Sequence, residues 1–227
     1  VTYSAAISAC EKGDNVWEQV LHLLGELERV NIEPNVITYN AAISACEKSK
    51  QWEQGVNLLR ELKRRDIEPS VITFNAAISA CEKAEQWVQA LHVFAKLQQT
   101  SIEPTLVTYN ACISACEKGG KWAQALHLLD ELQQGHIEPS VISYNSAISA
   151  CESGEQWRQA LHLLFELRHS DIEASLLTYN AAIGACESTE QWEQALQLLR
   201  ELQQSTIESS VATYDAAISA CEKSAHR

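Results

Sequence analysis

The sequence predicts an all-α protein, a right-handed superhelical α-solenoid of about seven helix-turn-helix repeats. One observation is an aromatic residue that recurs after 36 residues once and after 35 residues five times, at Tyr3, Tyr39, Phe74, Tyr109, Tyr144, Tyr179 and Tyr214. A second is that a near-copy of the string Ala-Ala-Ile-Ser-Ala-Cys-Glu follows each of them. A fixed period of roughly 20 to 50 residues is typical of stacked repeats, which form one continuous array.

The period divides the chain into one solenoid array, residues 1–227, without a linker or low-complexity stretch. The repeats are residues 1–35, 36–70, 71–105, 106–140, 141–175 and 176–210, with a partial repeat at 211–227. Because the chain begins within one repeat and ends after the first half of another, we expect it to be a segment of a longer protein. Any targeting segment would then lie outside it.

Each repeat is predicted to contain two helices. In the stretch Thr38 to Lys48, apolar residues recur at three- and four-residue spacing, and a second amphipathic stretch runs from about Trp52 to Arg65. The motif Ile-Glu-Pro, with its proline at Pro34, Pro69, Pro104 and Pro139, is expected to stop the second helix. One pair of short helices cannot bury both apolar stripes, so the pairs are expected to stack.

The residues of one repeat resemble a known family. The run Val-Ile-Thr-Tyr-Asn-Ala-Ala-Ile-Ser-Ala-Cys-Glu-Lys at residues 36–48, closed by Ile67-Glu68-Pro69-Ser70, is similar to the pentatricopeptide repeat of 35 residues. The resemblance covers essentially the whole chain. The residue string Ile-Ser-Ala-Cys-Glu-Lys also resembles repeats of dinoflagellate algae. It implies sequence-selective binding of single-stranded RNA, one base per repeat, inside an organelle, either the mitochondrion or the plastid.

The resemblance also implies which residues read the bases. The polar residue directly after each aromatic residue would act with the last residue of the same repeat. These pairs are Ser4 with Asn35, Asn40 with Ser70, Asn75 with Thr105, Asn110 with Ser140, Asn145 with Ser175, and Asn180 with Ser210. By the family's code, serine with asparagine favours adenine and asparagine with serine favours cytosine, which gives a site resembling 5′-ACCCCC-3′. The hypothesis requires the asparagine side chains to point into a groove rather than into contacts between repeats.

Two further roles come from the same resemblance. Aliphatic side chains that would sandwich successive bases stand two residues before the aromatic residue, at Val1, Ile37, Ile72, Val107, Ile142 and Leu177. Lysines that would approach the phosphates are Lys12, Lys48, Lys83, Lys118 and Lys223, whereas Ser153 and Ser188 replace the lysine in two repeats.

The overall charge favours a different class of function. With 17 basic and 30 acidic residues the net charge is −13, the reverse of the footprint expected for a nucleic-acid binder. The sequence does not decide whether the repeated glutamates lie beside the lysines or on the outer face. An alternative is therefore a non-catalytic scaffold that binds protein subunits of an organellar assembly, such as a ribosome or a membrane complex.

The sequence offers no enzyme site, no membrane span, no cofactor motif and no small-molecule substrate site. No nucleophile, phosphate loop or carboxylate pair stands outside the repeat pattern, and nowhere do 18 uninterrupted apolar residues occur. Cysteine recurs once per repeat on the predicted buried side of the first helix, without the pairing that a zinc site needs. We therefore expect small core residues, no metal, and a reducing compartment.

Overall fold

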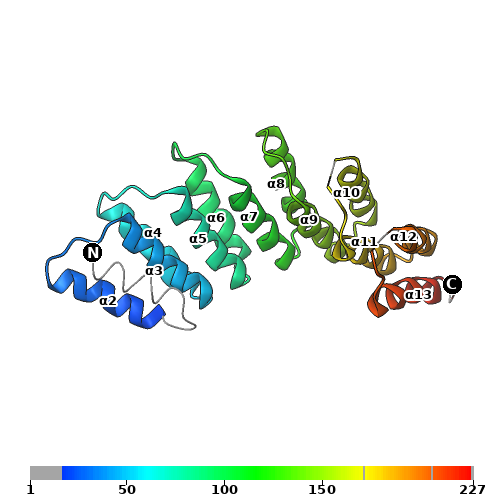
Figure 1. Ribbon diagram of the computed structural model, residues 1–227, viewed down its shortest axis with the longest axis horizontal. Coiled ribbons are helices and arrows are strands. Elements are labelled where there is room, and N and C mark those ends of the chain that lie inside the picture. Colours follow the sequence, from blue (N-terminus) through cyan, green and yellow to red (C-terminus); the bar gives the residue numbers. More distant parts are fainter. Residues whose placement is uncertain (1–16, 171, 206, 226–227) are drawn as a thin grey trace. The chain divides into compact units, whose positions relative to one another are not determined.

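The computed structural model describes residues 17–170, 172–205 and 207–225, and in these ranges every regular element is an α-helix (Figure 1). Each repeat between residues 36 and 210 contributes a first and a second helix, and the described parts of the two terminal repeats contribute one helix each. The first helices are α3 (Val36–Lys48), α5 (Val71–Lys83), α7 (Leu106–Lys118), α9 (Val141–Ser153), α11 (Leu176–Ser188) and α13 (Val211–Ala225). The second helices are α2 (Trp17–Arg29), α4 (Trp52–Arg64), α6 (Trp87–Gln98), α8 (Trp122–Gln134), α10 (Trp157–His169) and α12 (Trp192–Gln204). The predicted all-α repeat fold is confirmed.

The chain divides into two compact units, Val1–Ala115 and Cys116–Arg227, with the boundary inside α7. In unit 1, α3 packs against α5, and each packs against its own second helix. In unit 2, α9 packs against α11 and α11 against α13, with α10 and α12 as the second helices of α9 and α11. Each unit therefore has a layer of first helices and a layer of second helices, and α2, α4, α8, α10 and α12 also contact the following first helix. Within the described ranges, no helix has the length and apolar character needed to span a membrane.

Small residues allow the first helices to pack closely. In α3, Ala41, Ala42, Ala45 and Cys46 are buried together with Ile43. The distance between packed helices depends on the side chains at the contact, so alanine and cysteine permit a close approach. The second helices instead bury leucines, such as Leu128, Leu129 and Leu132 of α8.

The turn from first to second helix has the same geometry in five repeats. The backbone N–H of the residue before the second helix donates to the carbonyl of the repeated cysteine, as from Gln51 to Cys46 at 2.8 Å. The residue between the helices has a positive φ, as in Lys50 at 56° and Gly120 at 63°. This is the Schellman arrangement, in which a left-handed residue closes a helix C-terminus.

The prediction that the proline motif stops the second helix is wrong. Helix α4 ends at Arg64, and its last turn is closed by Asp66 with φ of 59° and by the Ile67 N–H donating to the Leu62 carbonyl at 3.1 Å. Pro69 lies beyond this turn and directly precedes Ser70, the N-cap of α5. The proline therefore belongs to the start of the next first helix, where its missing N–H costs nothing.

The repeated cysteines are core residues. Cys46, Cys81, Cys112, Cys116, Cys151 and Cys186 are buried and form no disulfide, whereas Cys221 is half-buried. Burial raises the pKa of the Cys81 thiol to about 12 and those of Cys46, Cys116, Cys151 and Cys186 to about 11. These thiols stay protonated at neutral pH, which disfavours both metal ligation and nucleophilic chemistry. Cys10 lies outside the described residues.

One first helix departs from the pattern at its ninth residue. Five described first helices have serine there, whereas α11 has Gly184, and a Cβ atom on Gly184 would collide with Oε1 of Glu152. The Glu152 carboxylate thus occupies the space of a missing side chain. Its pKa is raised, first by burial and then by the neighbouring charges of Glu187 and Glu117.

Two glycine substitutions should change stability in opposite directions. Gly120 has φ of 63°, so Gly120→Ala should lower the free energy of unfolding by roughly 1 kcal/mol. Gly25 lies inside α2 with open space around its Cα, so Gly25→Ala should raise it by roughly 0.5–1 kcal/mol. Urea unfolding followed by circular dichroism measures both changes. If both substitutions changed the free energy of unfolding in the same direction, the left-handed conformation of Gly120 would be contradicted.

The ionisation of Glu152 should destabilise the fold. A carboxyl whose pKa is raised on folding favours the folded state when protonated, and that stabilisation is lost as the pH rises through its folded-state pKa. Glu152→Gln should therefore raise the melting temperature at neutral pH, and the difference from wild type should shrink in acid. Glu138→Gln, at an exposed position, is the control and should show no such pH dependence. A neutral-pH melting temperature below that of wild type would contradict the interpretation.

Candidate nucleic-acid interface

One face of each first helix is open to solvent. In α3 it carries Ile37, Asn40, Ser44 and Glu47, whose spacings of three and four residues place them on one side of the helix. All four are exposed or half-buried, whereas Tyr39 is fully buried. We call the second, fifth, ninth and twelfth residues of the first helices the open face.

The aliphatic residues at the second position are exposed in every described complete repeat. The exposed fractions are 61% for Ile37, 61% for Ile72, 58% for Val107, 57% for Ile142 and 59% for Leu177. A single exposed apolar side chain is ordinary, but the same exposure at one position of successive repeats indicates a surface available for contact. Ala212, the equivalent residue of α13, is also exposed, and Val1 lies outside the described residues.

The asparagines at the fifth position contact the next repeat. Asn40 Nδ2 donates to Ser70 Oγ at 3.4 Å, and Thr73 Oγ1 donates to Asn40 Oδ1 at 2.5 Å. The same pair of bonds joins Asn75 to Thr105 and Thr108 at 3.4 and 2.6 Å, and Asn145 to Ser175 and Thr178 at 3.3 and 2.5 Å. Asn180 accepts from Thr213 at 2.7 Å. The expectation that these side chains avoid contacts between repeats is therefore wrong, and any contact with a base depends on the amide groups that these bonds leave unused.

In Asn40, Asn75 and Asn145 these contacts use half of the amide's hydrogen-bonding capacity. An asparagine amide has two N–H donors and two acceptor lone pairs on its oxygen. In Asn40 one donor serves Ser70 and one lone pair serves Thr73, which leaves one donor and one acceptor. The side chain is half-buried, so part of its surface remains open to solvent.

The second residue of each predicted base-reading pair is the N-cap of the following first helix. Ser70, Ser140 and Ser175 accept the backbone N–H three residues on, and the hydroxyl at that position accepts the cap's own N–H. Thr105 and Ser210 contact Thr108 and Thr213 in the same way. This structural role was not predicted from the sequence, although a capping residue followed three residues later by serine or threonine recurs before the first helices and could have indicated it.

The other predicted base-reading pairs can be compared with the structure only in part. Ser4 lies outside the described residues, and its partner Asn35 caps α3 by accepting the Thr38 N–H at 3.0 Å. Asn110 is half-buried in unit 1, and Ser140 belongs to unit 2. Asp215, the equivalent residue of α13, is exposed.

Two of the predicted phosphate lysines are paired with glutamates of the preceding repeat. Lys83 Nζ lies 2.7 Å from Glu47 Oε1, and Lys223 Nζ lies 3.0 Å from Glu187 Oε1. Lys48 and Lys118 occupy the same place, the last residue of α3 and α7, and both are exposed. Lys12 lies outside the described residues. The lysines are therefore near the open face, but Lys83 and Lys223 are not free.

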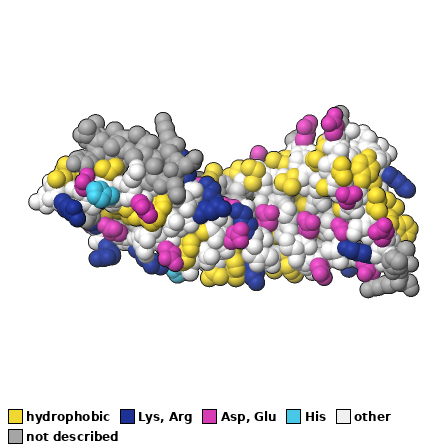
Figure 2. All heavy atoms as spheres, turned by 90° about the horizontal axis from the view of Figure 1, so that it is seen from below, with side chains coloured by type: hydrophobic (Ala, Val, Ile, Leu, Met, Phe, Trp, Pro, Cys, Tyr) yellow, Lys and Arg dark blue, Asp and Glu magenta, His cyan; other side chains and the backbone are white. Residues whose placement is uncertain are grey.

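The glutamates at the twelfth position share the open face with the asparagines. Ser219 Oγ donates to Glu187 Oε1 at 2.7 Å, and Ser114 Oγ to Glu82 Oε1 at 3.5 Å, so these carboxylates bridge neighbouring first helices. Acidic side chains also recur on the surface seen in Figure 2. The negative charge is thus not confined to the outer layer, and it opposes the approach of phosphates.

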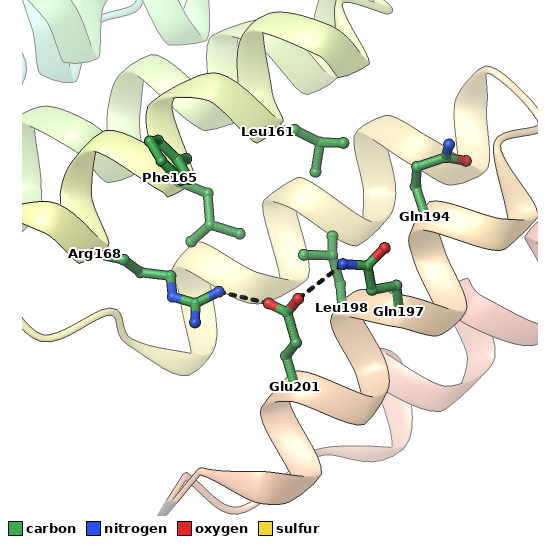
Figure 3. Close-up of a pocket in the computed structure, with 8 residues that line it drawn as sticks. Leu161, Phe165, Arg168, Gln194, Gln197, Leu198 and Glu201 are labelled. Atoms are coloured by element: carbon green, nitrogen blue, oxygen red, sulfur yellow. Dashed lines mark hydrogen bonds and ion pairs between the residues drawn. The ribbon is translucent and has the colours of Figure 1, made fainter.

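The second-helix layer of unit 2 has a small pocket between α10 and α12. Figure 3 shows Arg168 of α10 directed toward Glu201 of α12, with Gln197 on the other side of that carboxylate. The ion pair measures 2.6 Å, and Gln197 Nε2 donates to Glu201 at 3.1 Å. Leu161 and Phe165 line the apolar part, and Phe165 is 60% exposed. The cavity of about 170 Å³ is smaller than the roughly 300–1,000 Å³ of sites for drug-sized ligands.

Three family descriptions match the chain. The pentatricopeptide repeat domain matches residues 1–49, 57–119 and 162–224. The PPR repeat family matches residues 104–153, and the PPR repeat matches residues 37–67 and 142–172. No individually curated protein sequence is significantly similar to the chain.

Several solved structures have a similar fold. The pentatricopeptide repeat protein PPR10 from maize is 24% identical with a TM-score of 0.68, over 96% of this chain and 31% of that chain. The same protein in complex with an 18-nt psaJ RNA element is 18% identical with a TM-score of 0.62, over 99% and 38%. The PPR domain of Arabidopsis thaliana protein-only RNase P 1 in complex with tRNA is 14% identical with a TM-score of 0.69, over 79% and 95%.

The chain therefore spans about a third of the length of the PPR10 structures it resembles. The family descriptions cover most of the chain, and the 35-residue spacing of its helix pairs agrees with them. This protein belongs to the pentatricopeptide repeat family.

Proposed function

We propose that the open face binds single-stranded RNA, with one base per repeat and a preference for a C-rich site resembling 5′-ACCCCC-3′. Each base would lie between the aliphatic residues of neighbouring repeats, such as Ile37 and Ile72. Its edge would meet the asparagine between them. By family resemblance the setting is organellar RNA metabolism.

One observation supports the proposal. Along the first helices, an exposed aliphatic side chain recurs three residues before an asparagine whose amide keeps part of its hydrogen-bonding capacity. Ile142 and Asn145 are three residues apart on one helix face, and Asn145 bonds to Ser175 and Thr178 of the next repeat. The amide is thereby held between Ile142 and Leu177, both more than half exposed. Single-stranded RNA is recognised through the faces and edges of its unpaired bases, and this arrangement offers a contact for each.

Two solved relatives add support. PPR10 has been solved with an 18-nt psaJ RNA element, and the PPR domain of protein-only RNase P 1 with tRNA. Both have the same fold as this chain at low sequence identity. They make RNA the first ligand class to test.

The charge pattern predicts that phosphates contribute little to the affinity. Glu47 and Glu187 neutralise Lys83 and Lys223 at the edge where the family's lysines approach the backbone. Exposed ion pairs are worth only about 0–1 kcal/mol, so RNA can compete for the lysines, but at the cost of bringing phosphates close to carboxylates. Base contacts would then supply most of the selectivity.

Fluorescence anisotropy with labelled 5′-ACCCCC-3′, compared with U-rich and G-rich oligonucleotides, tests the proposal. The C-rich RNA should bind most tightly. Asn145→Ala should weaken binding about fivefold, because one hydrogen bond to the fifth base is worth about 1 kcal/mol. The variant should also bind RNA with cytosine or uracil at that base equally well.

Asn57→Ala is the matched control, since Asn57 is an exposed amide on the second helix α4 and should leave RNA binding unchanged. Absence of binding by the wild-type chain even at low salt would refute RNA recognition. Equal binding of all three sequences would refute base reading but retain RNA as a ligand.

Removal of the Glu47 charge should strengthen RNA binding. Glu47→Gln frees the Lys83 ammonium group for a phosphate, so the affinity should rise a few-fold. The salt dependence should steepen by up to about 0.7 in log–log slope, the value expected for one more phosphate contact on a single strand. Glu53→Gln removes the same charge from an exposed position on α4 and is the control. An equal effect of both variants would show a general charge effect instead of a local pair.

The second candidate is a scaffold that docks a protein. The pocket between α10 and α12 favours it, because an exposed Phe165 beside a cavity of about 170 Å³ suits a single side chain of a protein partner. This surface lies on the second-helix layer, so a Phe165→Ala variant should leave RNA binding unchanged. If the wild-type chain binds no RNA, the scaffold becomes the better supported function.

A further inference from the structure

Among the described second helices, the tenth residue is acidic in all but α6. The acidic residues at this position are Glu26, Glu61, Glu131, Glu166 and Glu201, whereas α6 has Lys96. In unit 2 this position makes a contact between repeats, because Arg168, the twelfth residue of α10, lies 2.6 Å from Glu201 of α12 (Figure 3). The tenth position of one second helix thus meets the twelfth position of the preceding one.

Unit 1 has like charges at the corresponding positions. The twelfth residue of α4 is Lys63, which takes the place of the arginine of α10. The tenth residue of α6 is Lys96, which takes the place of the glutamate of α12. Arg60, the ninth residue of α4, adds a third cation where α10 has the apolar Phe165. An attractive contact in unit 2 therefore corresponds to three cations in unit 1, Arg60, Lys63 and Lys96, which we call the cationic cluster.

The members of the cationic cluster act on one another. The pKa of Lys96 is lowered, first by burial and then by the positive charges of Arg60 and Lys63. Lys63 Nζ lies 5.3 Å from the centre of the Phe74 ring, a cation–π contact that favours this position of the ammonium group. Arg60 and Lys63 are exposed and Lys96 is half-buried, so a ligand from solvent can reach the cluster.

Within the described ranges, no carboxylate forms an ion pair with a member of the cationic cluster. Helix α6 contains no aspartate or glutamate. On α4, Glu61 follows Arg60, but its carboxylate already accepts from the Tyr39 hydroxyl at 3.0 Å and pairs with Arg65 at 2.9 Å. Arg60 itself donates to the uncharged amide of Asn57 at 3.2 Å. Three cations that repel one another without a counter-charge would be stabilised by a bound anion.

We propose that Arg60, Lys63 and Lys96 bind a phosphate group on the second-helix layer, either as a phosphate monoester or as free phosphate. At pH 7 a phosphate monoester carries about −1.5 to −2 charges and presents three acceptor oxygens, so it can accept from all three side chains. The guanidinium group of Arg60 can donate two parallel hydrogen bonds to it, and the lysines add charge. A carboxylate has a single charge and would leave part of the cluster unneutralised. The site lies on second helices and not on the open face, so it does not depend on base reading.

Titration of the whole chain with inorganic phosphate tests the site without RNA. At constant ionic strength, the backbone amide NMR signals of Lys63 and Lys96 should shift and saturate with phosphate, and acetate should move them much less. Lys96→Glu should weaken phosphate binding at least about tenfold, because a cation beside the ligand becomes an anion. Lys96→Arg should keep about the wild-type affinity. Arg200→Glu makes the same change of charge at an exposed position of α12 and is the control, with binding unchanged.

The same variant reports on the fold. Lys96→Glu creates the opposite-charge pair that joins α10 to α12, so its melting temperature without phosphate should equal or exceed that of wild type, and lost binding then does not result from unfolding. A lower melting temperature would contradict the repulsion within the cluster. Retained phosphate binding in Lys96→Glu, or equal weakening in Arg200→Glu, would overturn the site. Equal shifts with acetate would overturn phosphate as the ligand.

A pair of RNA probes identifies the source of the phosphate group. One RNA carries a 5′-terminal phosphate, and the other has the same sequence with a 5′-hydroxyl group. If wild type binds the phosphorylated RNA several-fold more tightly and Lys96→Glu removes the difference, the site takes an RNA end. Equal affinities, with inorganic phosphate still bound, assign the site to a small phosphate compound. Because the phosphate titration contains no RNA, failure of the proposed RNA binding and failure of this site are distinguishable.

Discussion

The close approach of neighbouring first helices is the constraint on which the rest of the structure depends. Alanine and cysteine at the contact, as in Ala42 and Cys46 of α3, bring the fifth residue of one helix within hydrogen-bonding distance of the next helix's N-cap. A larger side chain at this contact would separate Asn40 from Ser70 and Thr73. The same spacing brings Glu47 against Lys83, so the packing, the asparagine contacts and this ion pair follow from one register.

That register also places part of the chain's acidity in contacts between repeats. The glutamate at the twelfth position of a first helix is held by groups of the following repeat, as Glu187 is by Ser219 and Lys223. Where those partners are missing, the ionised carboxylate is expected to destabilise the fold. Glu152 faces Gly184 instead of serine, and its pKa is raised, first by burial and then by the charges of Glu187 and Glu117.

The fold could be predicted from the sequence because its signal repeats. The period, the apolar stripes and the starts of the second helices at tryptophan all follow from spacing, and α4 ends at Arg64 against the predicted Arg65. The stop signal was misassigned because Pro69 was interpreted alone, whereas a left-handed Asp66 ends the helix. The contacts of Asn40 could not be predicted, since they depend on the distance between two helices, which spacing along the chain does not encode.

The double use of the N-cap residue limits which amino acids can serve as the asparagine's partner. A first helix needs a side-chain oxygen at its cap, and asparagine, aspartate, serine and threonine provide it best. Ser175 Oγ accepts both the Thr178 N–H and the Asn145 amide N–H, so one hydroxyl serves the cap and the contact with the preceding repeat. An alanine at position 175 would remove both contacts at once. The asparagine's partner is therefore restricted to residues that can also begin a helix, which is a constraint of backbone chemistry.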